Sequence, residues 1–516
     1  MSSARRLGKM LLTGGLAFAA ATSGYAQDDP LSSNSGFGYS LHGFARTWVS
    51  VNLQNHPETQ ANDAGTPQMV RGSFELQGEA HWGKVSLHAV GRADQEYETP
   101  YLRRLDKMQN GNLMSQYNRV DLREFYLALP VGDRIDLAIG KQQVVWGETD
   151  FFRASDVISG FDYRWRSFLE ADNEELRKPL ELINMRLKVP EANGNFQAII
   201  RPGLDRSIDI GNTYDLYGGR WANQPYKGVN FLAPGFGQSS PLLTYNLSTP
   251  GANRKDVTGG ARWSGRMGDL QYSLAWLRTF NNDPVVNPNP AITGGVAYRS
   301  TPRGFLGDLI YPEVNLVAFT ANDYSPLLDA VWSTEVVYYS GQPFNLRGTF
   351  PGIPGLGGIA FKDTLVTMAR LDKQVDLTRV LGTSRPSFAS IQIFNTHIMN
   401  YNQLPNSSPE QLVKLVGFGA PLRKDATIIT GILATNYMND RINPGIAVGW
   451  DATYGGGFAI PNVDIAIGDN WRVRAELDLF FPTGQASTVG QPNSRTGLFG
   501  YFANDNQVMF RVTRQF

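Results

Sequence analysis

Short segments in which apolar and polar residues alternate are the dominant pattern along this chain. Residues 470–481 show it best, because every second position is apolar and most positions between are charged. The apolar set is Trp471, Val473, Ala475, Leu477 and Leu479, and the charged set is Arg472, Arg474, Glu476 and Asp478. A period of two places successive side chains on opposite faces of a β-strand. The segment is therefore predicted to be a strand with one apolar and one charged face.

The same alternation recurs in residues 72–82, 180–190 and 268–280. Their apolar faces consist of Phe74, Leu76, Ala80 and Trp82, of Ile183, Met185, Leu187 and Val189, and of Leu270, Tyr272, Leu274 and Trp276. The opposite faces carry Glu75, Gln77, Glu79 and His81 in the first segment, and Asn184, Arg186 and Lys188 in the second. Charges on one face, with Trp and Tyr near the strand ends, are typical of strands that cross a membrane around a polar lumen.

Fourteen further segments complete a set of eighteen predicted strands. They are 37–53, 83–98, 119–130, 133–147, 193–202, 255–266, 311–322, 328–342, 363–376, 386–400, 425–438, 443–454, 458–468 and 503–516. Short connections alternate with long ones, and this arrangement places both termini on the periplasmic side. We therefore predict an all-β fold, a transmembrane antiparallel β-barrel of about 18 strands, with 16 as the alternative. Residues 409–416, in a long connection, are predicted to form a short helix.

The first 26 residues have a composition of their own. Arg5, Arg6 and Lys9 precede a short apolar run at 10–21, and small residues occupy positions 24 and 26. These are the features of a secretory signal peptide. We predict a signal peptide over 1–26, a short periplasmic N-terminus over 27–36 and a barrel over 37–516.

The last strand ends in an aromatic residue. Phe516, Val512, Phe510 and Val508 share its apolar face, although Arg514 interrupts that face. The pattern resembles the C-terminal recognition signal of Gram-negative outer-membrane barrels. The resemblance implies export to the cell outer membrane, contact with its lipid, and the barrel-assembly machinery as a partner.

Composition narrows the classes of function. The chain has 47 basic and 47 acidic residues, and removal of 1–26, with three cations and no anion, leaves 44 against 47 and a net charge of −3. This balance argues against a nucleic-acid partner. Cysteine is absent, which excludes disulfides, thiolate metal sites and cysteine nucleophiles.

The third long connection, 149–179, combines many aromatic residues with many charges. An inward-folded loop explains this combination, because its aromatics pack on the wall while its charges line the passage. An extracellular loop that packs on itself is the alternative. The pore and constriction candidates are Trp146, Glu148, Asp150, Arg153, Arg164 and Arg166 from this region, with Glu75, Glu79, Arg186, Lys188, Arg472, Arg474, Glu476 and Asp478 from the wall.

The same region carries a family resemblance. The string Gly140-Lys141-Gln142, three residues, then Trp146-Gly147-Glu148, with Phe151-Phe152 and Asp156-Val157-Ile158 following, resembles the motif of a large family of outer-membrane proteins with a domain of unknown function. One departure is residues 159–162, where members often have Asn-Pro before the Asp. The resemblance implies a β-barrel and a role in moving hydrophobic or lipid-like compounds across the envelope. For some relatives it implies a link to inner-membrane export pumps.

The residues do not favour an enzyme. The chain has five histidines, and it lacks a G-x-S-x-G elbow, an H-E-x-x-H pair and a P-loop. We expect no catalytic, cofactor or metal site. Two functions remain: an outer-membrane channel for small or hydrophobic solutes, and a component of an export or uptake system that works with an inner-membrane transporter on hydrophobic cargo. An outer-membrane hydrolase is a weaker third.

Overall fold

The alternating segments form the wall of a barrel in the computed structural model. It describes residues 36–56, 59, 61–108, 113–147, 152–170, 173–215, 219–221, 243–246, 254–348, 355–403, 412–413, 422–481, 499 and 502–516. The predicted signal peptide and residues 27–35 lie outside this range. The wall strands are β1 (Phe37–Asn52), β2 (Pro67–Trp82), β3 (Val85–Glu96), β4 (Arg119–Val131), β5 (Ile135–Gln142), β6 (Leu180–Val189), β7 (Gly194–Arg201), β9 (Thr258–Met267), β10 (Leu270–Phe280), β13 (Glu313–Ser325), β14 (Ala330–Leu346), β15 (Gly358–Val375), β16 (Ser387–Ile398), β18 (Asp425–Ala434), β19 (Ile442–Asp451), β20 (Gly457–Ile467), β21 (Trp471–Phe481) and β22 (Gln507–Gln515).

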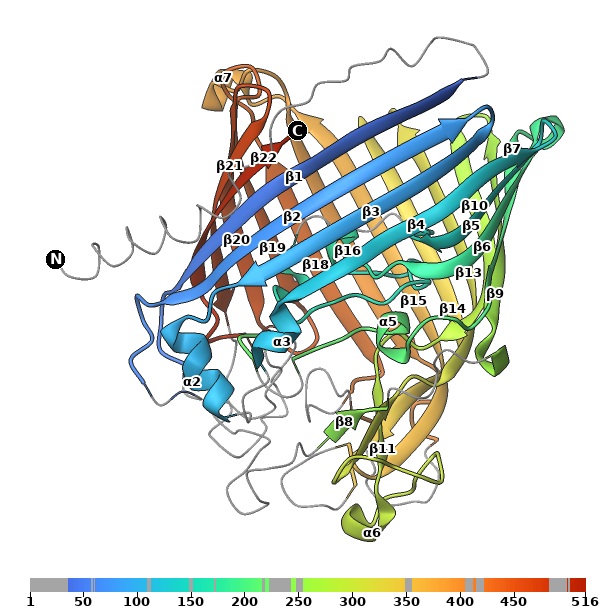
Figure 1. Ribbon diagram of the computed structural model, residues 1–516, viewed down its shortest axis with the longest axis vertical. Helices are drawn as coiled ribbons and strands as arrows, with labels where there is room; N and C mark the ends of the chain where they lie inside the picture. Colours follow the sequence, from blue (N-terminus) through green and yellow to red (C-terminus); the bar gives the residue numbers. More distant parts are fainter. Residues whose placement is uncertain are drawn as a thin grey trace.

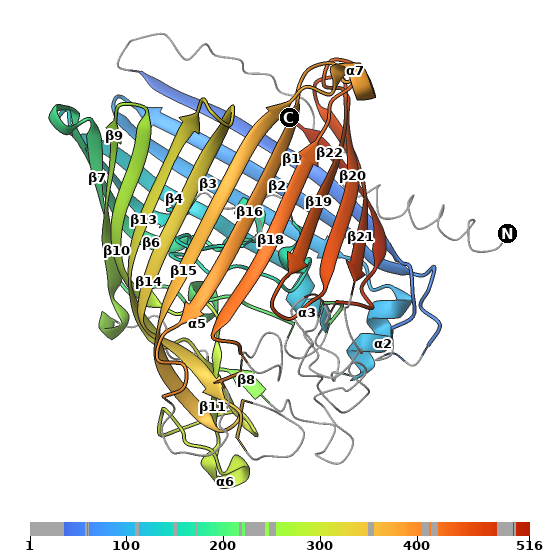
Figure 2. The same cartoon turned by 180° about the vertical axis from the view of Figure 1, so that it is seen from behind.

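Antiparallel pairing closes these eighteen strands into a ring. Each strand pairs with its neighbour in the chain, and β1 pairs with β22 in a register that sets Phe44 opposite Gln515 and Val51 opposite Val508. The backbones of Gly43 and Phe516 exchange two hydrogen bonds of 3.0 Å at this seam. The predicted barrel of eighteen strands is thereby confirmed, and sixteen is excluded (Figures 1 and 2). No helix in the described part of the chain is both long enough and apolar enough to cross a membrane.

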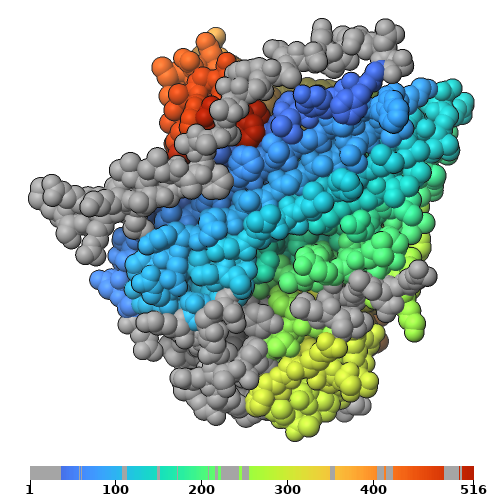
Figure 3. All heavy atoms as spheres, viewed as in Figure 1, coloured from blue at the N-terminus to red at the C-terminus, as the bar shows by residue number. Residues whose placement is uncertain are grey.

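The outer and inner faces of the wall divide as the alternation predicts. Trp276 is 50% exposed on the outside of β10, while Ser273 and Ala275 on the same strand are buried inside. The side chains of β1 to β4 form one continuous outer surface, blue to cyan in Figure 3. Glycines close several short turns between strands. Gly83 and Gly268 have φ values of 61° and 65°, a left-handed conformation that side chains with a Cβ adopt at a cost.

The wall strands differ greatly in length. β5 and β7 have eight residues each, whereas β14 and β15 have 17 and 18. β14 and β15 extend beyond the rest of the wall, next to a small sheet of β8 (Leu243–Tyr245), β11 (Val285–Pro288) and β12 (Gly307–Ile310) (Figure 2). The sequence pattern did not predict this small sheet, because its strands are too short to show a period.

Three local predictions need correction. The strand expected over 133–147 ends at Gln142, and residues 143–147 turn away from the wall with Val144 and Trp146 buried. The helix expected over 409–416 is wrong at Leu412–Val413, which form β17 and pair with the end of β14. The connection 99–118 contains two helices that were not predicted, α2 (Pro100–Met108) and α3 (Leu113–Tyr117).

A loop clamped across the lumen

The connection after β5 crosses the inside of the barrel. We call residues 152–170 and 173–179 the lumen loop. Ser155 donates from its backbone N (2.9 Å) and its Oγ (2.6 Å) to Glu335 on β14. Trp165 packs against Trp48 on β1, with ring centroids 5.4 Å apart. Since β14 and β1 lie in separate parts of the wall, the loop must cross the lumen to contact both. The inward fold predicted for this loop is therefore confirmed.

On one side the loop joins a cluster of ions on β1 to β4. The Glu175 carboxylate, in α4 (Asn173–Leu176), forms ion pairs with Arg46 of β1 and with Arg92 of β3, the latter at 2.9 Å. Burial acts to raise the pKa of Glu175, but the two guanidinium groups outweigh it and hold the pKa at about 2. Asp94 pairs with Arg92 and with Arg71, at 3.1 and 3.0 Å. The loop is therefore held here by buried charges of both signs.

The backbone of the same segment is bound by Arg123. This β4 residue donates to the carbonyl oxygens of Glu174 (2.7 Å), Glu175 (3.2 Å) and Arg177 (3.1 Å). It occupies a bulge between β3 and β4, where the register shifts after Val90. The extra residue aims the guanidinium at the end of a short helix, where carbonyl groups lack intrahelical partners.

A second ionic cluster fixes the middle of the loop to β21 and β22. Arg166 pairs with Glu170 at 3.0 Å and with Glu476 of β21, and all three side chains are at most 2% exposed. Arg474 donates to Glu476 at 2.8 Å, and Arg511 of β22 pairs with Glu170 at 3.2 Å. Arg166 and Glu476 lie more than 300 positions apart in the chain, and so do Glu170 and Arg511. No local sequence pattern therefore predicts these contacts.

The lumen loop also carries an ionic pair of its own. Arg164 forms two hydrogen bonds with Asp162, at 2.9 and 2.8 Å, and Arg119 of β4 approaches the same carboxylate at 3.3 Å. Burial acts to raise the pKa of Asp162, but the Arg164 and Arg119 charges hold the pKa well below its usual value. Burial lowers the pKa of the neighbouring Lys178 to about 7, while its ammonium donates to the carbonyls of Ile208 and Gly211.

The predicted site residues fall into three groups. Glu75, Arg153, Arg164, Arg166, Arg474, Glu476 and Asp478 lie in or against the lumen loop, and Trp146 is buried beside it, donating to Gln197 at 3.0 Å. Glu79, Arg186, Lys188 and Arg472 are exposed near the short turns at the other end of the barrel, away from the loop. Glu148 and Asp150 lie outside the described residues.

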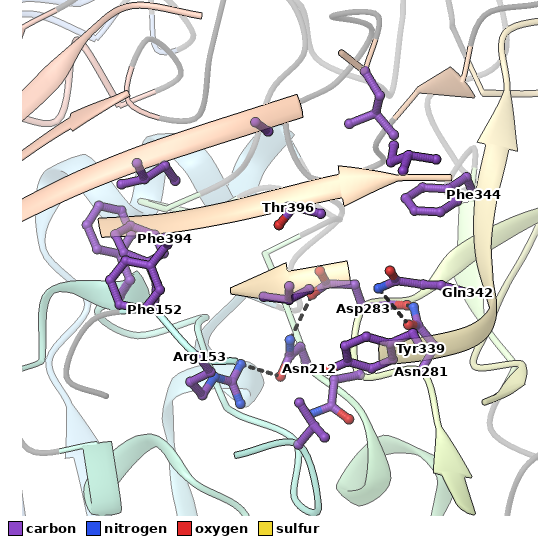
Figure 4. A pocket seen from close by; sticks show the side chains of 18 of the residues that line it. Phe152, Arg153, Asn212, Asn281, Asp283, Tyr339, Gln342, Phe344, Phe394 and Thr396 are labelled. Carbon is purple, nitrogen blue, oxygen red and sulfur yellow. Dashed lines mark hydrogen bonds between the residues drawn. The ribbon is translucent and has the colours of Figure 1, made fainter. Parts of the chain in front are cut away.

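A cavity of about 350 Å³ lies on the opposite side of the loop from the β1–β4 cluster. The lumen loop and strands β10, β13 to β16, β18 and β19 contribute lining residues, of which Phe152, Arg153 and Phe394 are labelled in Figure 4. One part of the lining is aromatic: Phe152 packs edge-on against Phe394 of β16, with centroids 5.7 Å apart. Another part is polar and contains Arg153, Asn212 and Asp283.

Arg153 is one of the predicted pore candidates, whereas the polar residues around it in this cavity were not predicted. Asn212 and Asp283 come from two later connections, and Gln342 and Thr396 come from β14 and β16. In the sequence, these residues are marked only as polar residues near the ends of predicted strands. Among the described residues, no group of three or more His, Asp or Glu is placed to hold a metal ion.

Three solved structures illustrate what the chain is similar to. OmpF of Salmonella typhi, in complex with daunomycin, is 10% identical over 93% of this chain and 97% of its own, with a TM-score of 0.40. OccAB3 of Acinetobacter baumannii is 9% identical over 93% and 99%, with a TM-score of 0.45. OpdK of Pseudomonas aeruginosa, with vanillate, is 10% identical over 93% and 98%, with a TM-score of 0.41. No curated protein matches the chain.

A family comparison covers the whole barrel. A family model described as "Protein of unknown function (DUF1302)" matches residues 34–516, which include every strand of the wall and the lumen loop. The chain therefore belongs to the DUF1302 family.

Proposed function

We propose that this protein is a channel of the Gram-negative outer membrane that passes small or hydrophobic solutes, with residues 1–26 removed on export. The observation that carries the proposal is a closed barrel whose lumen contains both a clamped loop and a cavity with a mixed lining. Loops folded into a lumen of this size narrow the passage, and their side chains set what can pass.

The membrane location rests on the outer surface of the wall. Trp82, Trp276, Trp450 and Trp471 are between 44% and 78% exposed, as are many aliphatic residues between them. A folded protein in water rarely leaves so large an apolar area uncovered. Lipid covers such a surface, and Trp residues favour the interface between lipid and water. The C-terminal aromatic face, with Phe510 and Phe516 exposed at 49% and 45%, fits a signal for the assembly machinery.

Conductance tests the proposal directly. The purified full chain, added to planar bilayers, is expected to produce discrete current steps. A variant lacking residues 152–170 is expected to produce larger steps, because the deleted segment crosses the lumen. Absence of steps from both proteins would refute the channel.

Liposome swelling then separates the passive channel from a component that needs an inner-membrane partner. Liposomes that contain only this protein are expected to swell with small sugars and amino acids added outside. Conductance without swelling by any solute of the panel would favour the partner-dependent system, in which cargo moves only when a second protein supplies energy.

A further inference from the structure

The cavity beside the lumen loop has a polar end built around Arg153. Its guanidinium lies 3.5 Å from the centroid of the Phe161 ring, and its Nη2 donates to the Tyr163 hydroxyl (2.8 Å) and to Asn212 Oδ1 (3.3 Å). These contacts fix the plane of the guanidinium without neutralising it. No carboxylate of the described chain forms an ion pair with Arg153, and its Nη1 is buried without a hydrogen-bond partner. A buried cation in this state favours an anion beside it.

The two carboxylates that act on Arg153, those of Asp156 and Asp283, are already engaged elsewhere: Asp156 pairs with Arg177 at 2.6 Å. Asp283 Oδ1 accepts from the Tyr214 hydroxyl (2.5 Å) and from Asn212 Nδ2 (2.8 Å). Asn212 thus bridges Arg153 and Asp283 and keeps the two charges from a direct pair. Figure 4 shows Arg153 and Asn212 joined at one edge of the cavity, with Asp283 close behind. The arrangement holds a cation ready for an external ligand.

Another part of the lining is apolar and is suited to the apolar body of a ligand. Phe152 and Phe394 meet at one side of the cavity, and Phe344 lies across it in Figure 4. Phe280, Val314 and Val366 add apolar side chains from three wall strands. A volume of about 350 Å³ is at the lower end of cavities that hold small organic ligands. A ligand that fills both parts must therefore be amphipathic.

We propose that this cavity binds amphipathic monocarboxylates, with the carboxylate at Arg153 and the apolar body between Phe152 and Phe394. The inference rests on the proposed channel and names the class of solute that its lumen selects. The apolar body displaces water from the aromatic surface, and the carboxylate supplies a direct ion pair, which no described residue forms with Arg153. A neutral amphiphile gains only the displacement of water from the aromatic surface. An alkylammonium ion is repelled by the positive charge of Arg153.

Calorimetric titration of the protein in lipid nanodiscs tests the assignment. The ligands are straight-chain carboxylates of four to eight carbons, with the alcohols and ammonium salts of equal length as controls. Each added methylene is expected to tighten binding by about fourfold until the cavity is filled. The alcohols are expected to bind at least about tenfold more weakly than the acids of the same length. Acid binding no tighter than that of the alcohols or the ammonium ions would overturn the proposal, because partitioning into lipid does not favour the charged carboxylate over the neutral alcohol.

Three variants separate the site from the fold. Arg153→Gln is expected to abolish the preference for acids and to leave alcohol binding within twofold, while Arg153→Lys retains part of the preference. Arg278→Gln is the matched control, because Arg278 pairs with Glu313 on the exposed side of the wall and does not line the cavity. If Arg153→Gln fails to fold, the comparison of ligands on the unaltered protein still decides the question. Channel conductance without selective acid binding would refute this site alone, and acid binding without conductance would refute the channel alone.

Discussion

The contact between Arg166 and Glu476 makes the clamping of the lumen loop testable. Arg166 reaches from the loop into the cluster on β21 and β22, where it faces Glu170 and Glu476. Arg474 and Arg511 are the other cations of this cluster, and Asp464 is the third carboxylate, so three positive charges oppose three negative ones. Arg166→Ala removes one of the cations and leaves an excess buried carboxylate.

The structure sets the size of the effect. Removing one partner of a buried pair costs about 3–5 kcal/mol, because the other charge stays desolvated. That range corresponds to an increase of about 10²–10³ or more in the fraction of loops released from β21. Arg166→Ala combined with Glu476→Ala removes a carboxylate together with the cation, so its effect is expected to be smaller than that of Arg166→Ala alone.

Single-channel recording and hydrogen exchange report the release. Arg166→Ala is expected to show frequent transitions to a larger conductance, and faster amide exchange in residues 164–170. Arg278→Ala is the control, because Arg278 pairs with Glu313 on the exposed side of the wall. The reasoning is refuted if Arg166→Ala gives the traces and exchange rates of the unaltered protein, or if the double variant is more disturbed than the single one.

Three further outcomes follow from the same structure. Glu335→Ala removes the acceptor of both Ser155 hydrogen bonds and is expected to raise amide exchange at residues 154–157 at least tenfold, whereas Thr334→Val on the outward face of β14 is expected to leave it unchanged. Burial raises the pKa of Asp215 to about 8, so between about pH 4 and 8 the Asp215 carboxyl group is protonated in the folded protein and ionised in the unfolded chain. The contribution of Asp215 to the stability of the fold therefore falls as pH rises through that window. Asp215→Asn is expected to melt at the same temperature as the unaltered protein at pH 5 and to lose less stability by pH 8. Deletion of Phe516, whose ring stacks on Phe74 with centroids 5.8 Å apart, is expected to lower the fraction of folded barrel in the outer membrane, and an unchanged fraction would reject it as an assembly signal.

The strands were predictable because each records its own two faces. A strand such as β21 needs no knowledge of its neighbours to show that Trp471 faces out and Glu476 faces in. The alternation along a strand shows which face of the sheet a side chain occupies, but not how far along the barrel axis the side chain lies. For this reason Arg472 and Glu476 look equivalent in sequence, although only Glu476 meets the lumen loop. Residues 143–147 show that alternation alone can also mislead. Their pattern fits a strand, but Val144 and Trp146 are buried among residues of β6 and β7, and the segment does not extend the wall.

The two sides of the lumen loop differ in a way that bears on selectivity. Toward β1 to β4, β21 and β22 its contacts include several ion pairs, and most charges there are buried opposite a partner. Toward β14 and β16 its contacts are hydrogen bonds, such as those from Ser155 to Glu335, and aromatic packing, such as that of Phe152 against Phe394, and the cavity lies on that side. The fields of paired charges cancel at distances beyond a few ångströms. A solute that follows the open side therefore meets a weak general field and, at Arg153, a cation that forms no direct ion pair with a described residue. We accordingly expect little discrimination between simple cations and anions, so the shape and apolar area of a solute should decide its passage more than the sign of its charge, except where a carboxylate can reach Arg153.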